Sequence, residues 1–208
     1  MTVDAILEAT AHILAQRGYD GTTTNHVAER AGVSIGSLYQ YFPSKESLVA
    51  ALLQRNAEDN LRTLRESIEQ AEGMTLAGAL RTIVDRFVAM HAQAPAHHAA
   101  LLDRAPQIGI VEWERQSTDG VLQVLGDFLS RYRSELRDGL DLEMALPVLA
   151  AMGNAVLDHA LRNNPGRLKD EDIRHEMVVA ILAYLTGRIS PPTEDDRAED
   201  SRATSPKK

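Results

Sequence analysis

Apolar residues recur every three or four positions through most of this chain, which is the spacing of one face of an α-helix. In the first fifty residues the pattern predicts three short helices, over residues 2–17, 24–31 and 35–41. Gly18 suits a left-handed stop after the first helix, and Gly32 permits a sharp turn between the second and the third. Long Val/Ile/Thr alternations are absent, and Ala, Leu, Glu and Arg dominate, so we expect an all-α protein.

The same spacing continues in longer segments after Pro43 and Ser44 interrupt the chain. It predicts further helices over residues 45–72, 76–94, 108–137, 142–163 and 169–188, with a short one between Pro95 and Pro106. From Ser190 the chain is rich in proline, acidic residues and serine, so we expect 189–208 to be a disordered tail. The sequence therefore predicts about nine helices in two domains, 1–46 and 47–188, followed by the tail.

Composition narrows the location and the chemistry of this helical chain. With 208 residues and 44% apolar content, it is long enough to bury a sizeable core. We find no apolar run that approaches the roughly 18 residues needed to span a bilayer, and no signal-peptide pattern. We therefore expect a soluble, cytoplasmic protein without a membrane partner. Cysteine is absent, which excludes disulfides and thiolate metal sites.

The second and third predicted helices have the spacing of a helix-turn-helix. They are joined by the turn Gly32-Val33-Ser34, an arrangement that places the second helix of the pair in the DNA major groove. The plain alternative is a three-helix bundle without a ligand. That alternative does not explain why Tyr39, Gln40 and Tyr41 stand on a short helix with little apolar content. Against DNA, Gln40 can pair with a base edge and the tyrosine hydroxyls can reach phosphates.

The N-terminal fifty residues also resemble a known family. The shared positions are Gly18-Tyr19, Thr22-Thr23, Val27-Ala28, Ala31-Gly32-Val33-Ser34, Gly36, Leu38-Tyr39, Tyr41-Phe42, Lys45-Glu46 and Leu48. In this order they resemble the start of a TetR-family transcriptional regulator. The resemblance implies a dimer, with an N-terminal helix-turn-helix domain and a C-terminal helical bundle for ligand binding and dimerisation.

The resemblance also implies which residues contact DNA. Phosphates would be held by Thr23, Thr24, Tyr39, Tyr41 and Lys45, and bases would be faced by Asn25, Ile35, Gly36, Ser37 and Gln40. Ser34, the expected cap of the third helix, belongs to the same set. From its residue type alone, Ser37 can donate or accept a hydrogen bond, and Gly36 lets the backbone approach closely.

The charge of the chain bears on how it would bind DNA. The formal net charge is −8, and residues 1–50 carry only Arg17, Arg30 and Lys45 against five acidic residues. A non-specific electrostatic binder would be more basic. We therefore expect a small, well-placed set of contacts, with two copies of the chain acting together on double-stranded DNA.

Residues 142–163 are apolar nearly all round, so a helix there must be buried on two sides. One side would pack in its own domain. The other would meet the same helix and the one at 169–188 of a second subunit, giving a homodimer through 142–163 and 169–188. Small residues at Ala150, Gly153 and Ala160 allow close approach of the helices. The alternative is that 142–163 is the central helix of a monomeric bundle.

The resemblance also implies a ligand pocket between the helices at 76–94, 108–137 and 142–163. Candidate lining residues are Phe87, Met90, His91, Trp113, Gln116, Met152 and Asn154. Ordinary core packing is the alternative for Phe87, Met90 and Met152. Asn154 is a polar side chain in an apolar helix and needs a partner. Because the set is mostly apolar, we expect a lipophilic small-molecule effector.

Metal and catalytic chemistry are weakly supported by the sequence. His97 and His98 are adjacent, so on a helix they point in different directions, and Asp172 with His175 is a single carboxylate-x-x-His pair where a di-iron bundle needs two. No Gly-x-Ser-x-Gly motif or phosphate loop is present. We expect no metal site, no cofactor and no enzymatic activity.

Our hypothesis is a transcriptional repressor that leaves a palindromic operator when the small molecule binds. A ligand-independent regulator or activator of the same fold is the alternative, and a metal-sensing helical protein is a more distant one.

Overall fold

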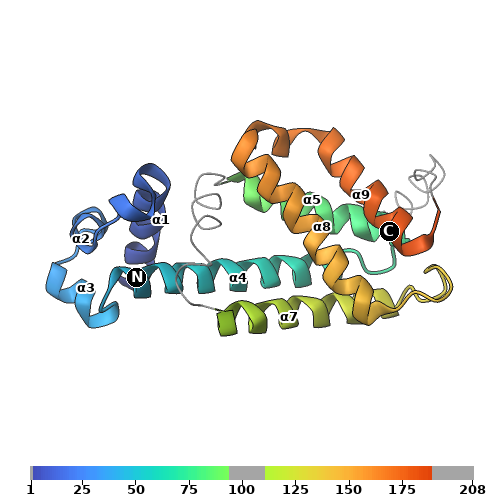
Figure 1. Ribbon diagram of the computed structural model, residues 1–208, viewed down its shortest axis with the longest axis horizontal. Helices are drawn as coiled ribbons and strands as arrows, with labels where there is room; N and C mark the ends of the chain where they lie inside the picture. Colours follow the sequence, from blue (N-terminus) through green and yellow to red (C-terminus); the bar gives the residue numbers. More distant parts are fainter. Residues whose placement is uncertain (1, 94–110, 189–208) are drawn as a thin grey trace, which may run out of the picture. The chain divides into compact units, whose positions relative to one another are not determined.

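The computed structural model describes residues 2–93 and 111–188, with the backbone alone described for 111–117. The regular secondary structure in these ranges is helical, which confirms the all-α prediction (Figure 1). Eight α-helices and one 3-10 helix lie in the described ranges, close to the expected nine. They are α1 (Thr2–Gly21), α2 (Thr24–Ala31), α3 (Ile35–Tyr41), α4 (Lys45–Gln70), α5 (Leu76–Gln93), α7 (Val111–Ser130), α8 (Leu142–Asn163), η2 (Pro165–Lys169) and α9 (Glu171–Thr186).

Glycines stand where the sequence predicted the helices to stop. Gly18 and Gly32 have φ angles of 66° and 68°, which is the left-handed region. Such a conformation costs glycine little, because it has no Cβ atom. In α1 the helical turn continues for three residues beyond Gly18, so the first helix is kinked there.

The predicted helix at 108–137 is wrong at its C-terminal end, because α7 ends at Ser130 and turns follow to Gly139. Distant parts of the chain hold these turns. The Tyr132 hydroxyl donates to the Met74 carbonyl at 3.1 Å, and the Arg137 N–H donates to the Leu185 carbonyl at 2.9 Å. Such tertiary bonds override a local helical pattern. The predicted helix between Pro95 and Pro106 and the tail at 189–208 lie outside the described residues.

The chain forms two compact units, and the first contains the residues up to Asp59. It consists of α1, α2, α3 and the beginning of α4, packed around one apolar core. Leu38 of α3 and Val27 of α2 are fully buried in this core together with Leu48 of α4. These three helices therefore fix the turn between α2 and α3.

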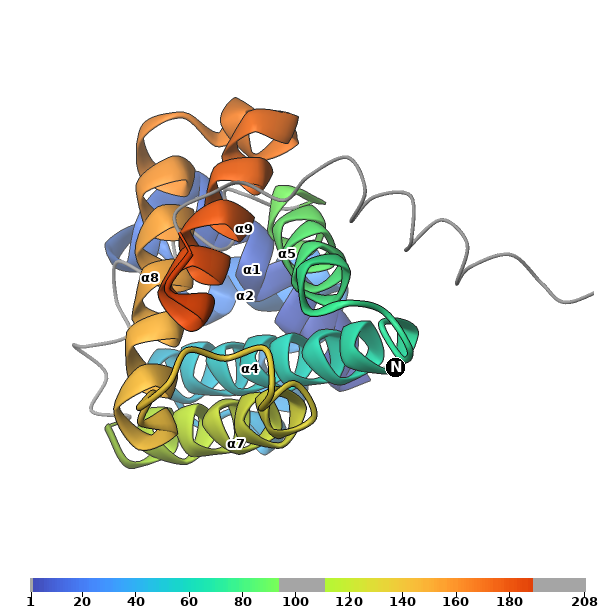
Figure 2. The same cartoon turned by 90° about the vertical axis from the view of Figure 1, so that its right-hand side faces the viewer.

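The second unit contains Asn60–Gln93 and the residues from Thr118 onward. Within it α5 packs against α9 and η2, and α8 packs against η2 and α9. The later parts of α4 and α7 run side by side (Figures 1 and 2). The Leu61 Cδ2 atom of α4 lies 3.6 Å from the place that a Cβ atom would occupy if Gly120 of α7 had a side chain. The core of this unit includes Leu76, Val88, Leu129, Leu168 and Leu185, each at most 1% exposed.

Helix α8 is buried on one side only within a single chain. Leu149, Leu157 and Leu161 face the core, whereas Met144 and Val148 are 67% and 40% exposed. By length and composition α8 is also the one described helix that is apolar enough to cross a membrane, so the expectation that no segment reaches that level was wrong. Core helices of soluble proteins meet the same criterion, and 28% of the apolar window of α8 is buried within the single chain.

Candidate nucleic-acid interface

Local hydrogen bonds build the predicted turn between α2 and α3. The Thr23 hydroxyl caps α2 by accepting from the His26 N–H at 3.3 Å. After α2, the Gly32 N–H donates to the Glu29 carbonyl at 3.2 Å, and the Val33 N–H donates to the Ala28 carbonyl at 3.0 Å. These bonds satisfy the last carbonyls of α2 and turn the chain sharply toward α3.

The Ser34 hydroxyl caps α3 by accepting from the Ser37 N–H at 3.0 Å, as expected. The two serine hydroxyls also lie 2.8 Å apart, so the Ser37 side chain is hydrogen-bonded to the cap and is half-buried. Ser37 was expected to face bases, and in the free protein its hydroxyl already has a partner. It can still offer its remaining hydrogen-bonding capacity, since a hydroxyl combines one donor with two lone pairs.

One side of α3 is anchored in the core and the other is open to solvent. Leu38 is fully buried, whereas Tyr39 and Tyr41 are 48% and 51% exposed. Ile35 and Gln40 are exposed as well. The exposed side carries the residues that the sequence analysis assigned to DNA.

Among the described residues, none packs so closely against Gly36 that a larger side chain would be excluded. A Cβ atom built there would have the Ser34 hydroxyl oxygen as its nearest neighbour, at 3.8 Å, which is ordinary contact. The backbone of α3 at Gly36 is exposed. An absent side chain at this point leaves room for a molecule outside the chain to approach the backbone.

A hydrogen bond between two hydroxyls links the two helices of the motif. The Thr24 hydroxyl of α2 lies 3.1 Å from the Tyr39 hydroxyl of α3. Both residues were expected to hold phosphates, and the structure brings their hydroxyls together. A phosphate oxygen placed beside this pair would therefore have two hydroxyl groups within hydrogen-bonding distance.

Lys45 was also expected to hold a phosphate, and the structure ties its ammonium group to the end of α1. The Nζ atom donates to the Tyr19 carbonyl at 3.1 Å and lies 4.0 Å from the centre of the Tyr19 ring. The Tyr19 hydroxyl in turn donates to Glu46 at 3.1 Å. Because an ammonium has three N–H donors, Lys45 keeps donors for a phosphate while its position is fixed.

The neighbouring Glu46 carboxylate is held in its charged form. A backbone hydrogen bond at the start of α4 is the main cause that lowers its pKa, and hydrogen bonds from Ser44 and Tyr19 add to the effect. This Tyr19–Lys45–Glu46 cluster was not predicted from the sequence, because Tyr19 lies 26 residues before Lys45. The Glu46 carboxylate therefore places a negative charge next to Lys45, in a unit that already has few basic residues.

The candidate pocket residues of the second unit differ in their surroundings. His91 is buried, with Nδ1 2.8 Å from the Phe87 carbonyl oxygen and its ring centre 4.5 Å from that of Phe87. Burial lowers the pKa of His91, which favours the neutral imidazole. Met90 and Met152 are half-buried.

Asn154 is exposed on α8, so the buried partner expected for its amide is not needed within one chain. The side chains of Trp113 and Gln116, and the residues His97 and His98, lie outside the described part of the structure. Among the side chains that the structure describes, no three His, Cys, Asp or Glu residues gather as a metal ion would require.

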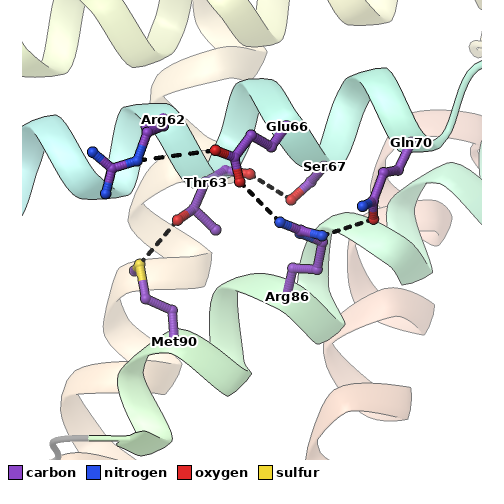
Figure 3. Close-up of polar contacts among 7 residues, drawn as sticks. All are labelled: Arg62, Thr63, Glu66, Ser67, Gln70, Arg86 and Met90. Atoms are coloured by element: carbon purple, nitrogen blue, oxygen red, sulfur yellow. Dashed lines mark hydrogen bonds and ion pairs between the residues drawn. The ribbon is translucent and has the colours of Figure 1, made fainter.

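A polar network between α4 and α5 was not predicted from the sequence (Figure 3). The Arg86 guanidinium of α5 donates to the Glu66 carboxylate at 3.0 Å and to the side-chain amide oxygen of Gln70 at 2.8 Å. Arg62 lies 3.9 Å from Glu66 on the same helix. One turn away, the Thr63 hydroxyl donates to the Met90 sulfur at 3.2 Å. The network fastens the second half of α4 to α5.

Comparison with known proteins also separates an N-terminal part of the chain from a C-terminal part. Residues 6–52 match the family model of bacterial regulatory proteins of the tetR family, and residues 75–185 match the model of the tetracyclin repressor-like C-terminal domain. The HTH-type transcriptional repressor KstR of Mycolicibacterium smegmatis is 47% identical over 53 residues, which are 26% of this chain and 26% of the repressor.

Two comparisons extend over most of the chain. The fatty acid metabolism regulator protein of Bacillus subtilis is 23% identical over 146 residues, covering 67% of this chain and 73% of that protein. The crystal structure of the regulator FadR from Bacillus subtilis, in complex with stearoyl-CoA, superposes with a TM-score of 0.71 at 19% identity. It covers 88% of this chain and 98% of that one. At this identity the structural likeness shows a shared fold.

Proposed function

This chain belongs to the TetR family of bacterial regulatory proteins, and we propose that it is a homodimeric repressor released from its operator by a lipophilic small molecule. Membership makes it a DNA-binding transcription regulator. The repressor role agrees with the relative KstR, which is 47% identical to this chain over 53 residues. The palindromic operator, the effector and the dimer interface are the proposed parts.

The observation that carries the proposal is the exposed polar face of α3 opposite the buried Leu38. Gln40 can form paired hydrogen bonds with adenine in the major groove, the usual partner of its amide. The Tyr41 hydroxyl and the Thr24–Tyr39 pair supply neutral phosphate contacts. These contacts position the helix without requiring the basic surface that this unit lacks.

A homodimer gives this small contact set enough affinity. The exposed apolar side of α8, which includes Met144, Val148 and Val156, supports dimerisation through α8 together with α9. A two-fold interface buries the same patch on both subunits. It also presents two copies of α3 to half-sites about one helical turn apart, roughly 34–36 Å.

An effector that binds the second unit would release DNA only if its affinity differs between the DNA-free and the DNA-bound arrangement of the protein. It must bind the DNA-free arrangement more tightly than the DNA-bound one, since equal affinity shifts nothing. Coupling of about 1–3 kcal/mol is usual between two such sites. The half-buried Phe87, Met90 and Met152 support a lipophilic ligand, and the stearoyl-CoA bound to FadR shows that this fold can hold one.

The test begins with selection of DNA from a random pool by the purified full-length protein, followed by mobility shifts at two salt concentrations. We expect a palindromic site with a strong preference over scrambled DNA. Adding acyl-CoAs, fatty acids or alkanols should then release the protein. Lack of any sequence preference would overturn the proposal. A site bound equally with and without every probe would instead indicate a ligand-independent regulator.

A further inference from the structure

Asn60 is a polar residue of α4 whose side-chain oxygen is buried without a hydrogen-bond donor. Its Oδ1 atom is enclosed, and no described residue donates to it. Most buried polar atoms in proteins have a partner, which is protein, water or ligand. Leaving an acceptor unpaired costs free energy, so this site favours any molecule that brings a donor.

The neighbouring polar residue on the same side of α4 is bound to a poor acceptor. Thr63 lies three residues after Asn60, on the adjacent turn of one helix face. Its hydroxyl donates to the Met90 sulfur at 3.2 Å, and a thioether is a weak acceptor (Figure 3). Thr63 can therefore give its hydrogen bond to a better acceptor at little cost.

Together Asn60 and Thr63 offer one acceptor and one donor about 4.5 Å apart along the helix axis. A hydroxyl group matches this pair, because it donates one hydrogen bond and accepts others. Its O–H would donate to Asn60 Oδ1, and its oxygen would accept from Thr63. An ether oxygen can satisfy only Thr63.

Charge argues against an acidic group at the same place. Glu66 lies three residues after Thr63 on α4, and Arg62 of α4 and Arg86 of α5 are both paired with it. A carboxylate would meet the unpaired oxygen of Asn60 and compete with Glu66 for these cations. Repulsion of this kind disfavours an anion.

We propose that Asn60 and Thr63 bind the hydroxyl group of a neutral lipophilic effector, such as an alcohol, next to Met90. The inference rests on the proposed effector site and names its ligand class. It does not depend on release of DNA. It adds two residues of α4 to a site that the sequence assigned to later helices.

The test compares three probes of equal length by calorimetry on the full-length protein: 1-nonanol, its isomer octyl methyl ether, and nonanoate. We expect wild-type protein to bind nonanol about tenfold more tightly than the ether, which corresponds to one hydrogen bond and the acceptor it satisfies. Nonanoate should bind more weakly than nonanol. The Asn60→Leu variant should lose the preference for nonanol, whereas Thr63→Val should weaken both nonanol and the ether.

Asn56→Leu is the matched control, because Asn56 is half-buried one turn earlier on the same helix and has no enclosed, unpaired atom. It should keep the wild-type preference. A readout without ligand comes from urea unfolding, in which Asn60→Leu should raise the midpoint by removing an unpaired acceptor. Asn60→Ala is a smaller second variant if leucine does not fit.

Equal binding of nonanol and the ether, tighter binding of nonanoate, no binding of any probe, or a preference that survives Asn60→Leu would each overturn the inference. A lowered urea midpoint would also overturn it, since Asn60 would then have a structural partner such as an internal water. Release of operator DNA is measured separately. Nonanol that binds as expected without releasing DNA would uphold the inference and refute ligand-released repression. Release of DNA by acyl-CoA without any preference for the alcohol would support ligand-released repression and refute the inference about Asn60 and Thr63.

Discussion

Replacing Val148 with aspartate should dissociate the dimer. Val148 lies on the apolar side of α8, where it is 40% exposed in the single chain. Full burial of a valine side chain contributes about 1.5–3 kcal/mol, so covering the exposed 40% contributes about 0.6–1.2 kcal/mol per subunit. A two-fold interface loses this contribution twice, about 1.2–2.4 kcal/mol in all.

That loss corresponds to an increase of about 7- to 50-fold in the dissociation constant of the dimer, at about 1.4 kcal/mol for each factor of ten. It is a lower bound, because the variant also brings two carboxylates into an apolar interface. Sedimentation velocity over a concentration series measures the constant directly. Mobility shifts should show weaker binding to a full palindrome and little change on a half-site.

Val3→Asp is the matched control. Val3 is 37% exposed, almost the same fraction as Val148, and lies on α1 in the N-terminal unit. The added charge and the lost apolar area are nearly equal in the two variants. The reasoning is refuted if Val148→Asp leaves the dissociation constant unchanged, or if Val3→Asp raises it as much.

Five further variants separate the roles of individual side chains. Tyr41→Phe should weaken binding to all DNA sequences alike by about 0.5–1.5 kcal/mol, whereas Gln40→Ala should relax the preference at one base pair by about 1–3 kcal/mol; mobility shifts on matched and mismatched operators would contradict this if both variants behaved identically. Arg86→Met should lower the free energy of unfolding by about 1 kcal/mol, because it removes the bonds to Glu66 and Gln70 at a site that is 34% exposed. Arg81→Met, which removes only an exposed pair with Asp85, should cost about 0.3–0.5 kcal/mol, and equal urea midpoints would argue against the network. Burial lowers the pKa of His91 in the folded protein below its ordinary value of 6.5, so the unfolded chain takes up the proton first as the pH falls. Stability should therefore be level above pH 7.5 or so and decline below about 6.5, and His91→Phe should flatten the decline in urea titrations between pH 5 and 8.

The N-terminal unit was predictable from sequence because its signals are local. Thr23 and Ser34 cap helices through bonds to residues three positions away, and Gly32 stops a helix by its own backbone angle. Leu38 is buried because its position in the helical repeat places it on the side of α3 that faces the core. Each of these effects acts within one or two turns, which a sequence displays directly.

Contacts between distant residues were not predictable in the same way. Lys45 was expected to hold a phosphate, and its bond to the Tyr19 carbonyl, which was not predicted, depends on the packing of α1 against α4. The end of α7 depends on bonds from Tyr132 to Met74 and from Arg137 to Leu185. Such pairs appear only once the tertiary structure is known, because nothing in their spacing identifies them.

Helix α4 contributes both to the core beneath the proposed DNA contacts and to the proposed effector contacts. It runs without a break from Lys45 to Gln70, belongs to the first unit up to Asp59, and to the second from Asn60. Its first turns bury Leu48 in the core that also holds Leu38 of α3. Its later turns carry Asn60 and Thr63. Both kinds of contact therefore depend on the arrangement that one helix adopts.

This dependence sets the size of the effect that a ligand must produce. Release of DNA requires a difference in ligand affinity between the two arrangements, and typical couplings of about 1–3 kcal/mol are the size of one or two hydrogen bonds. A hydroxyl that satisfied Asn60 in only one arrangement would supply such a difference by itself. The Arg86 bonds to Glu66 and Gln70 act on the same stretch of α4, and they stabilise whichever arrangement keeps α4 against α5. The effector must therefore overcome or reinforce these bonds, so Arg86→Met should change the ligand concentration needed for release even though Arg86 is not expected to touch the ligand.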